Sequence, residues 1–276
     1  MPLFRWGPAR EGLSAVGALW HSRPMTDARP TWLPFDRYLE LIEADAHRLL
    51  DVASRDLNAA VPGCPDWTVT DLCRHLAEVY AHKIACMAAG APPKPWPLPE
   101  FQIGEPLQLL ARESTAIVEA LRSRDPADST WTWLPADQTV GFWYRRMAQE
   151  TAVHRVDGEQ AVGEQTAIDE ALAVDGVDEF LGCMLGGPWW TDGDYSATNA
   201  TVRVETGSHG WYVRCASAAV EVRYGDADAE VDATIAGEPE QLLLALWGRT
   251  PLLELVVDGD PEAAGRFAGR VQLCGD

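Results

Sequence analysis

Hydrophobic positions in the first two thirds of the chain recur every three or four residues. In the segment that begins at Phe35, for example, Leu39, Ile42 and Ala46 follow this spacing, which is the period of a helix with one apolar face. The pattern predicts helices over residues 35–55, 68–89, 107–124, 139–162 and 167–181. Residues 91–99 contain five prolines and are expected to form a loop.

The pattern changes after Gly186, where apolar and polar residues alternate and valine becomes frequent. Such alternation is typical of antiparallel strands with one buried face. Strands are expected at residues 200–205, 211–216, 219–224 and 230–236, with a further candidate at 252–257. A short amphipathic helix is expected over 238–248. Asp260 as N-cap and Pro261 as first helical residue predict a last helix that runs to about Arg270.

The change of pattern divides the chain into an all-α part and a following α+β part. We expect a helical domain over residues 31–188 and a smaller α+β domain over residues 195–276. Residues 1–30 are expected to be a disordered or non-native leader, since Met25 precedes the first periodic segment and the preceding residues lack the features of a signal peptide. The alternative is a genuine but poorly ordered arm.

The chain of 276 residues carries a formal net charge of −20. A protein this acidic lacks the basic surface that nucleic acids and anionic membranes require, so neither is expected as a partner. No apolar run reaches the roughly 18 residues of a transmembrane helix. The six cysteines contain no C-x-x-C pair, and free, mostly buried thiols in a cytoplasmic protein are the expectation.

A carboxylate and a histidine stand together on the helix predicted over residues 139–162. Glu150 and His154 are four positions apart and share a helix face with Trp143 and Met147. A carboxylate on such an apolar face is costly to bury without a partner. Glu150 is therefore expected to be paired, protonated or bound to a metal.

The helix predicted over residues 68–89 carries a similar anomaly, because His75 lies among apolar residues such as Leu76. Helical bundles often build metal sites from inward side chains on facing helices, and such packing can bring His75 opposite the pair on the other helix. Two imidazoles and one carboxylate form the ligand set of a catalytic zinc site with an open fourth position.

Simpler interpretations of these residues remain open. Glu150 can pair with Arg146 or Arg74, His154 can be a satisfied core histidine, and His75 can cap a turn. Alternative ligands on the same helix as His75 are Glu78 and His82.

Other catalytic motifs are missing from the sequence. It contains no G-x-S-x-G elbow, no P-loop and no G-x-G-x-x-G after a strand. Cys64, in a turn rich in proline, is either a nucleophile or a turn residue packed under Trp67. Trp189 and Trp190 at the domain boundary either line a pocket or pack the two domains together.

Three stretches of the chain resemble the mycothiol-dependent maleylpyruvate isomerase family of actinobacteria. They are VPGCPDWTVTDLCRHL at 61–76, ETAVHRVDGEQA at 150–161 followed by LAVDGVDEF at 172–180, and ATIAGEPEQLLLALWGR at 233–249, which continues to DGD at 258–260. Together they span roughly residues 35–270.

The resemblance implies a DinB-like four-helix bundle followed by a sterol-carrier-like α+β domain. It also implies a divalent metal, most often zinc, held by a histidine of the second helix and a Glu-x-x-x-His pair. These ligands correspond to His75, Glu150 and His154. The family further has a catalytic arginine in its C-terminal domain, for which Arg249 is the candidate. The alternative is that Arg249 only caps its helix.

The resemblance also implies that mycothiol is the cofactor. A bound metal would stabilise the thiolate form of this thiol at neutral pH. The expected reaction is cis–trans isomerisation of a maleylpyruvate-like substrate, or S-transfer to another small-molecule electrophile, in a monomeric protein. Arg249 would hold a substrate carboxylate between the domains. Alternative functions are a non-catalytic module that binds a small molecule or lipid, and a metal hydrolase of thiol conjugates.

Overall fold

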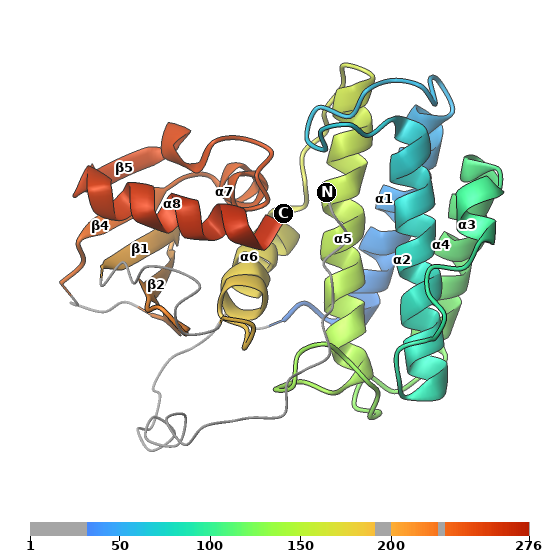
Figure 1. The fold of residues 1–276 in the computed structure, drawn as a ribbon, viewed down its shortest axis with the longest axis horizontal. Coiled ribbons are helices and arrows are strands. Elements are labelled where there is room, and N and C mark those ends of the chain that lie inside the picture. Colours follow the sequence, from blue (N-terminus) through green and yellow to red (C-terminus); the bar gives the residue numbers. More distant parts are fainter. Residues whose placement is uncertain (1–31, 191–199, 226–229, 276) are drawn as a thin grey trace.

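The computed structural model describes residues 32–190, 200–225 and 230–275. A helical part lies beside a part built on a β-sheet, and helix α6 (Glu170–Glu179) lies between them (Figure 1). The expected leader at 1–30 lies outside the described residues. Residues 191–194, between the two expected domains, also lie outside them.

Four long helices form the N-terminal part, and each agrees with a predicted segment to within about two residues at either end. They are α1 (Phe35–Ala53), α2 (Val69–Ala89), α4 (Pro106–Arg122) and α5 (Val140–Ala161). A short helix, α3 (Glu100–Ile103), follows the proline-rich loop and was not predicted. Helix α5 packs against α1 and α2, and α4 packs on the other side of these two.

The start of α2 is fixed by a capping box. The Thr68 hydroxyl accepts a hydrogen bond from the Asp71 backbone N–H, and the Asp71 carboxylate accepts one from the Thr68 N–H. These two hydrogen bonds satisfy two of the backbone donors that the start of a helix leaves without a partner. The cap thus fixes the start of the helix that carries His75.

Helix α5 corrects one expectation. One buried face, which carries Glu150 and His154, was expected, but the helix is buried on nearly all sides, because α1 and α2 cover one side and α6 lies along another. Its buried charges are therefore paired. Arg145 contacts Asp175 and Asp178 of α6, and Arg155 contacts Glu159 one turn further on. The period of the apolar residues alone could not reveal these internal ion pairs.

The fifth predicted helix is shorter than expected and changes character. Helix α6 passes directly into a π-helical segment, η2 (Phe180–Leu185). Trp189 and Trp190 follow it, and their indole N–H groups donate to the carbonyl oxygens of Met184 and Leu185. The two tryptophans thus pack back on the end of this segment.

The C-terminal part is a five-stranded sheet with the order β3-β2-β1-β4-β5. Its strands are β1 (Thr201–Thr206), β2 (His209–Cys215), β3 (Val220–Tyr224), β4 (Ala233–Ala236) and β5 (Val256–Gly259). Helices α7 (Pro239–Leu246) and α8 (Pro261–Gly275) complete it, and α8 lies across the sheet (Figure 1).

Two expectations for this part are corrected by the structure. The strands are not all antiparallel, because β4 runs parallel to its neighbour β1. Alternation reveals which face of a strand is buried but not the direction in which it runs. The strand expected at 252–257 exists but starts later than expected, because Leu252–Glu254 form a 3-10 turn and β5 covers Val256–Gly259, with Leu252 buried and Leu253 exposed.

The two parts share a buried polar contact. The Trp211 indole N–H, on β2, donates to Asp178 Oδ1 of α6 at 3.0 Å. The same carboxylate accepts from Arg145 of α5 through its other oxygen at 2.8 Å. A chain of contacts therefore runs from the helical part through α6 to the sheet.

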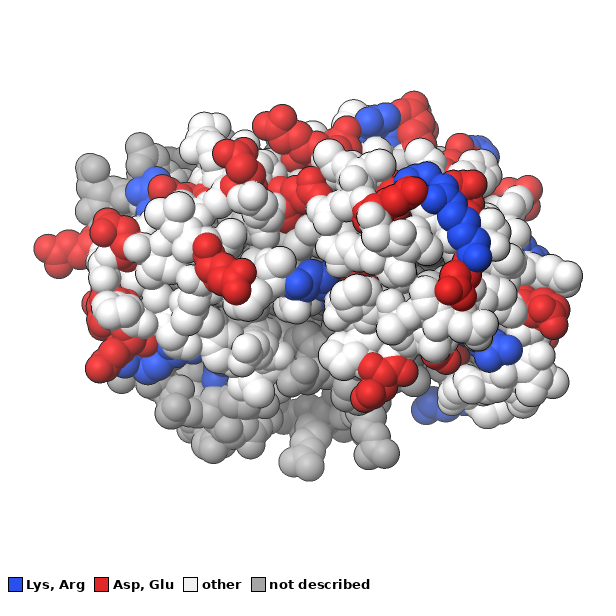
Figure 2. Space-filling view, turned by 90° about the horizontal axis from the view of Figure 1, so that it is seen from above, with Lys and Arg blue, Asp and Glu red and all other residues white. Residues whose placement is uncertain are grey.

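Acidic side chains are spread over the face of the molecule in Figure 2, on both parts, and basic ones are fewer. This distribution agrees with the net charge of −20. All six cysteines are free and buried, as expected. Among the described residues, every helix is too short or too polar to cross a bilayer.

Candidate metal centre

The three predicted ligands meet in the structure. His75 comes from α2, and Glu150 and His154 come from successive turns of α5. The Oε1 atom of Glu150 lies 3.3 Å from His75 Nε2 and 3.4 Å from His154 Nε2. Two imidazoles and a carboxylate thus point toward one small volume from two helices that pack together.

These separations fit a common metal ion. Zinc bound at about 2.0–2.1 Å in a tetrahedron has neighbouring ligand atoms about 3.3–3.4 Å apart. The carboxylate oxygen keeps that spacing from both imidazole nitrogens, and the ligand atoms of all three residues lie within 4.8 Å of one another. The donor set, two nitrogens and one oxygen, also suits a borderline cation such as zinc.

The centre is open on one side. The side chains of His75 and Glu150 are each 18% exposed, whereas that of His154 is 5% exposed. Trp67 covers part of the histidine pair, with its ring centre 4.9 Å from that of His75. A small ligand can therefore approach from the His75 and Glu150 side, as a catalytic site with an open position requires.

Glu150 is oriented by Arg146, one helical turn earlier. Arg146 Nη2 donates to Glu150 Oε2 at 3.0 Å, so that Oε1 is the oxygen left to face the histidines. Burial alone would raise the Glu150 pKa, but hydrogen bonds from the two histidines and the charges of His154 and Arg146 hold it well below its usual range. Glu150 is thus an ionised acceptor at neutral pH.

Arg146 also pairs with Glu179 at the end of α6. Its guanidinium lies over the ring of Trp247, 5.1 Å from the ring centre, in the C-terminal part. This is the distance range of a cation–π contact. The group that orients Glu150 is therefore itself held by the C-terminal part.

His154 is oriented by Asp157, a residue that the sequence analysis did not single out. His154 Nδ1 lies 2.8 Å from Asp157 Oδ2. Burial alone would raise the Asp157 pKa, but the charge of Arg249 and the hydrogen bond to His154 lower it well below its usual range. An ionised Asp157 accepts the Nδ1 proton, so that Nε2 is the nitrogen of His154 that faces Glu150 and the site.

The candidate catalytic residue Arg249 lies against Asp157. Its Nε donates to Asp157 Oδ1 at 3.0 Å and its Nη2 to Oδ2 at 2.6 Å, which is a bidentate pair. The Arg249 side chain is 1% exposed and that of Asp157 is 0% exposed. Arg249 thus reaches the border of the centre through Asp157, not through one of the three ligands.

The turn that contains Cys64 packs on this ion pair. The Cys64 thiol is 3.6 Å from Asp157 Oδ2 and 3.5 Å from Arg249 Nη2. Burial, followed by the nearby Asp157 charge, raises the Cys64 pKa to about 12, so that the thiol stays protonated at neutral pH. A protonated, buried thiol is a poor nucleophile, which favours the interpretation of Cys64 as a packed turn residue.

The other candidates lie elsewhere. The Arg74 guanidinium donates to the carbonyl oxygen of Gly104, not to Glu150. His82 Nδ1 lies 3.2 Å from Lys83 Nζ, two helical turns beyond His75. Cys64, His154 and Asp157 form a second close group, but its members already bond to one another and to Arg249.

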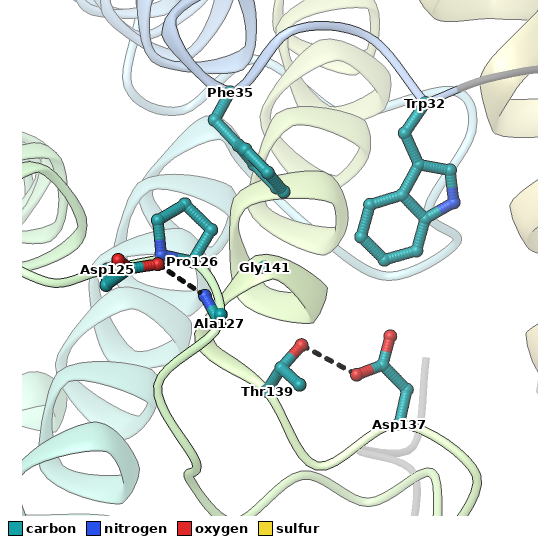
Figure 3. A pocket seen from close by; sticks show the side chains of 8 residues that line it. All are labelled: Trp32, Phe35, Asp125, Pro126, Ala127, Asp137, Thr139 and Gly141. Carbon is teal, nitrogen blue, oxygen red and sulfur yellow. Dashed lines mark hydrogen bonds between the residues drawn. The ribbon is translucent and has the colours of Figure 1, made fainter.

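A hollow of about 500 Å³ lies away from the centre, between the start of α1 and the loop before α5 (Figure 3). Trp32 and Phe35 form one wall, and Asp137 and Thr139 another. The Thr139 hydroxyl donates to Asp137 at 2.7 Å. None of the three candidate ligands lines it, so it has no part in the metal centre.

The sequence offered a signal for Asp157, namely its position three residues after His154 on the same helix face. It offered none for the pairing of Asp157 with Arg249, because 92 residues and a change of domain separate them.

The fold and the site together define a two-part protein, helical and then α+β, with a candidate His₂Glu metal centre on the helical part. Residues 39–158 match the family model described as the mycothiol maleylpyruvate isomerase N-terminal domain. Residues 171–266 match the model of the MDMPI C-terminal domain. The chain therefore belongs to the mycothiol-dependent maleylpyruvate isomerase family.

Solved structures support the fold. The crystal structure of the mycothiol-dependent maleylpyruvate isomerase is 14% identical, with a TM-score of 0.55, over 79% of this chain and 90% of that chain. A histidine-to-alanine mutant of the same enzyme matches with the same identity and TM-score, over 82% and 93%.

A third structure, titled UbiJ-SCP2 Ubiquinone synthesis protein, is 19% identical and covers 40% of this chain and 96% of that chain. Its TM-score of 0.28 is too low to support the sterol-carrier-like expectation. No curated protein sequence matches the chain.

Proposed function

We propose that this protein is a metal-dependent isomerase that uses the thiol mycothiol as cofactor and takes a small, maleylpyruvate-like electrophile as substrate. Family membership supports the isomerase kind. The observation that carries the metal part is the convergence of His75, Glu150 and His154, with the carboxylate oxygen 3.3 and 3.4 Å from the two imidazole nitrogens.

In this proposal the three residues hold a divalent cation, with zinc as the expected ion. When bound, such a cation supplies thiol activation, because it favours the ionised, nucleophilic form of a coordinated thiol at neutral pH. The chain's own groups prepare the site. Arg146 keeps the Glu150 carboxylate turned toward the histidines, and Asp157 keeps the proton of His154 on Nδ1.

The metal part is tested first by elemental mass spectrometry of the full chain, purified without an affinity-tag histidine run. The wild type is expected to carry about one equivalent of a divalent metal per chain, and Glu150→Gln much less. Glu78→Gln is the matched control, because Glu78 is also a buried carboxylate, one turn from His75 on α2. Wild-type protein without metal would contradict the proposal.

The reaction is tested with the metal-loaded protein, mycothiol and maleylpyruvate. Conversion to the trans isomer with the thiol regenerated supports the isomerase. Consumption of the thiol and accumulation of a conjugate with other electrophiles would instead support S-transfer, and release of an amine from a mycothiol conjugate would support a hydrolase. A stoichiometric lipid extracted from a metal-free protein would favour the non-catalytic binding module.

A further inference from the structure

We infer that the segment Trp247–Gly248–Arg249 supports the metal centre from the C-terminal domain, so that docking of this domain sets how tightly the helical domain holds its cation. The inference rests on the proposed function only in that a cation binds at His75, Glu150 and His154. It assigns Arg249 a positioning role through Asp157 and makes no use of direct contact between Arg249 and substrate.

Arg249 secures His154 through one intermediate residue. Arg249 holds both carboxylate oxygens of Asp157, and Asp157 Oδ2 in turn lies 2.8 Å from His154 Nδ1. Carboxylates that hold a metal-ligating histidine in this way fix its tautomer and ring orientation. Without Arg249, the buried Asp157 carboxylate would lose its main compensating charge and its fixed position.

Most of the hydrogen-bond donors of Arg249 are already used within the protein. A guanidinium has five N–H donors, and four hydrogen bonds occupy Arg249. Two go to Asp157, one to the Cys64 sulfur and one to the carbonyl oxygen of Trp247. A substrate carboxylate could recruit this arginine only by breaking a bidentate, buried ion pair. The contacts therefore favour a role in holding Asp157.

Trp247 supports Glu150, the other candidate ligand on α5, through Arg146. Its ring lies under the Arg146 guanidinium, which bonds Glu150 Oε2 at 3.0 Å. Phe180 packs edge-on against the same ring, with 5.0 Å between ring centres. One short segment of the C-terminal domain thus reaches the groups that orient both Glu150 and His154.

The local backbone makes this double contact possible. Gly248 separates the two residues and has φ of +73°, a left-handed conformation that glycine adopts without strain. The carbonyl oxygen of Trp247 accepts from Arg249 Nη1 at 2.7 Å, which ties the two ends of the segment together. Both side chains are therefore presented by one closed turn after α7.

The turn of the helical domain that contains Gly63 packs against the Asp157–Arg249 ion pair. A Cβ atom at Gly63 would lie 2.6 Å from Asp157 Oδ1 and 3.0 Å from Arg249 Cγ. The glycine at this position lets the turn pack directly on the Asp157–Arg249 pair. Gly63→Ala therefore disturbs the pair while leaving every charged group and every ligand in the chain.

The experiment measures the dissociation constant of Zn²⁺ for the full-length protein by competition with a chromogenic chelator. Asp157→Asn is expected to weaken zinc binding by about 10–100-fold. Arg249→Gln, Trp247→Leu and Gly63→Ala are expected to weaken it in the same direction but less, and Arg249→Lys to recover part of the loss. The absorption spectrum of bound Co²⁺ should change in the same variants, since it reports ligand geometry.

The double variant Asp157→Asn/Arg249→Gln provides a second criterion. Because both residues act through His154 in this inference, the loss in the double variant is expected to be smaller than the product of the single losses. Arg270→Gln is the matched control for general damage to the C-terminal domain. Arg270 is a buried arginine that bonds Ala216 and lies over Trp190, and its substitution should leave the zinc constant unchanged.

Each outcome is decisive. If Arg249→Gln keeps the wild-type zinc constant and Co²⁺ spectrum but loses activity, Arg249 acts on the substrate and the inference is wrong. If Arg249→Gln fails to fold by circular dichroism, Trp247→Leu and Gly63→Ala decide by the same measurement. Absence of zinc binding in the wild type would instead overturn the proposed function.

Discussion

The Nε2 atom of His75 lies 3.3 Å from the Oε1 atom of Glu150, although 75 residues separate them in the chain. The contact joins α2 to α5, as does a second buried polar contact of 2.6 Å between the hydroxyls of Tyr80 and Thr151. The histidine ring is held at this place by Trp67 and by the edge of the His154 ring, whose centre is 5.1 Å away.

The first prediction concerns metal removal. A ligand that binds only the folded protein raises the free energy of unfolding by about 4 kcal/mol at 1,000 times its dissociation constant. Zinc at that excess should therefore raise the midpoint of thermal unfolding, and a chelator should reverse the rise. His75→Ala should abolish the shift. His82→Ala, a control on the same helix, should keep it, and a shift that survives in His75→Ala would argue against the ligand set.

The second prediction concerns the cap of α2. Thr68→Ala removes the hydroxyl that accepts the Asp71 N–H, and loss of such a cap costs about 1 kcal/mol. Urea unfolding should show this decrease. Thr115→Ala serves as a control, since that exposed threonine only bonds the carbonyl oxygen of Ala111 within its own helix. Equal stability of Thr68→Ala and wild type would show that the capping box is not needed.

The third prediction is a pH dependence carried by Glu159. Burial raises its pKa, but hydrogen bonds from Thr166, Arg48 and Arg155 outweigh this effect and lower the pKa from 4.5 to about 2. A lowered carboxylate pKa adds stability above the unfolded-state value, and that stability is lost as pH falls from about 4.5 toward 2. The full contribution at neutral pH is about 3 kcal/mol.

Urea unfolding of wild type and Glu159→Gln between pH 7 and pH 3 measures this contribution. The difference between the two proteins should be largest at neutral pH and shrink as the solution is acidified. Glu164→Gln is the control, because Glu164 is an exposed partner of the same Arg48 and exposed pairs contribute less than about 1 kcal/mol. A difference that does not vary with pH would refute this origin.

The fourth prediction concerns the packing of α1 on α5. A Cβ atom at Gly158 would lie 2.3 Å from Leu49 Cδ1, so Gly158→Ala overpacks the helix crossing and should cost about 1–3 kcal/mol. Gly265 in α8 has open space at the same position. Gly265→Ala should therefore be neutral or stabilise by up to about 1 kcal/mol. Chemical denaturation compares the two, and similar effects would mean that the crossing can relax.

Periodicity predicted the helical elements well because it reports which face of a segment is buried. It located α2 and α5, and the i, i+4 spacing of Glu150 and His154 then predicted that both lie on one face. It failed for the direction of β4, which depends on how the chain returns to the sheet, a property that no local pattern encodes. The turn at Leu252 was mistaken for a strand because its run of apolar residues fits either structure.

The site was predictable only in part, for a related reason. Ligands on two helices can be inferred when each is an anomaly on an apolar face, as His75 and Glu150 are. Arg249 was assigned from a resemblance, but its pairing with Asp157 could not be inferred, because the contact joins two domains. The same holds for Arg146, whose contact with Glu150 was one of two alternatives considered from the sequence, but whose contact with Trp247 was not considered.

The sequence separation between Asp157 and Arg249 also sets a delay during synthesis of the chain. The three candidate ligands and Asp157 all belong to the first 158 residues, and Arg249 follows Asp157 after 92 residues. At a synthesis rate of about 5–20 residues per second, the ribosome needs about 5–20 s to add them. The helical domain is therefore synthesised seconds before its last supporting arginine exists, and under the proposed function completion of the chain would be the event that fixes the cation in place.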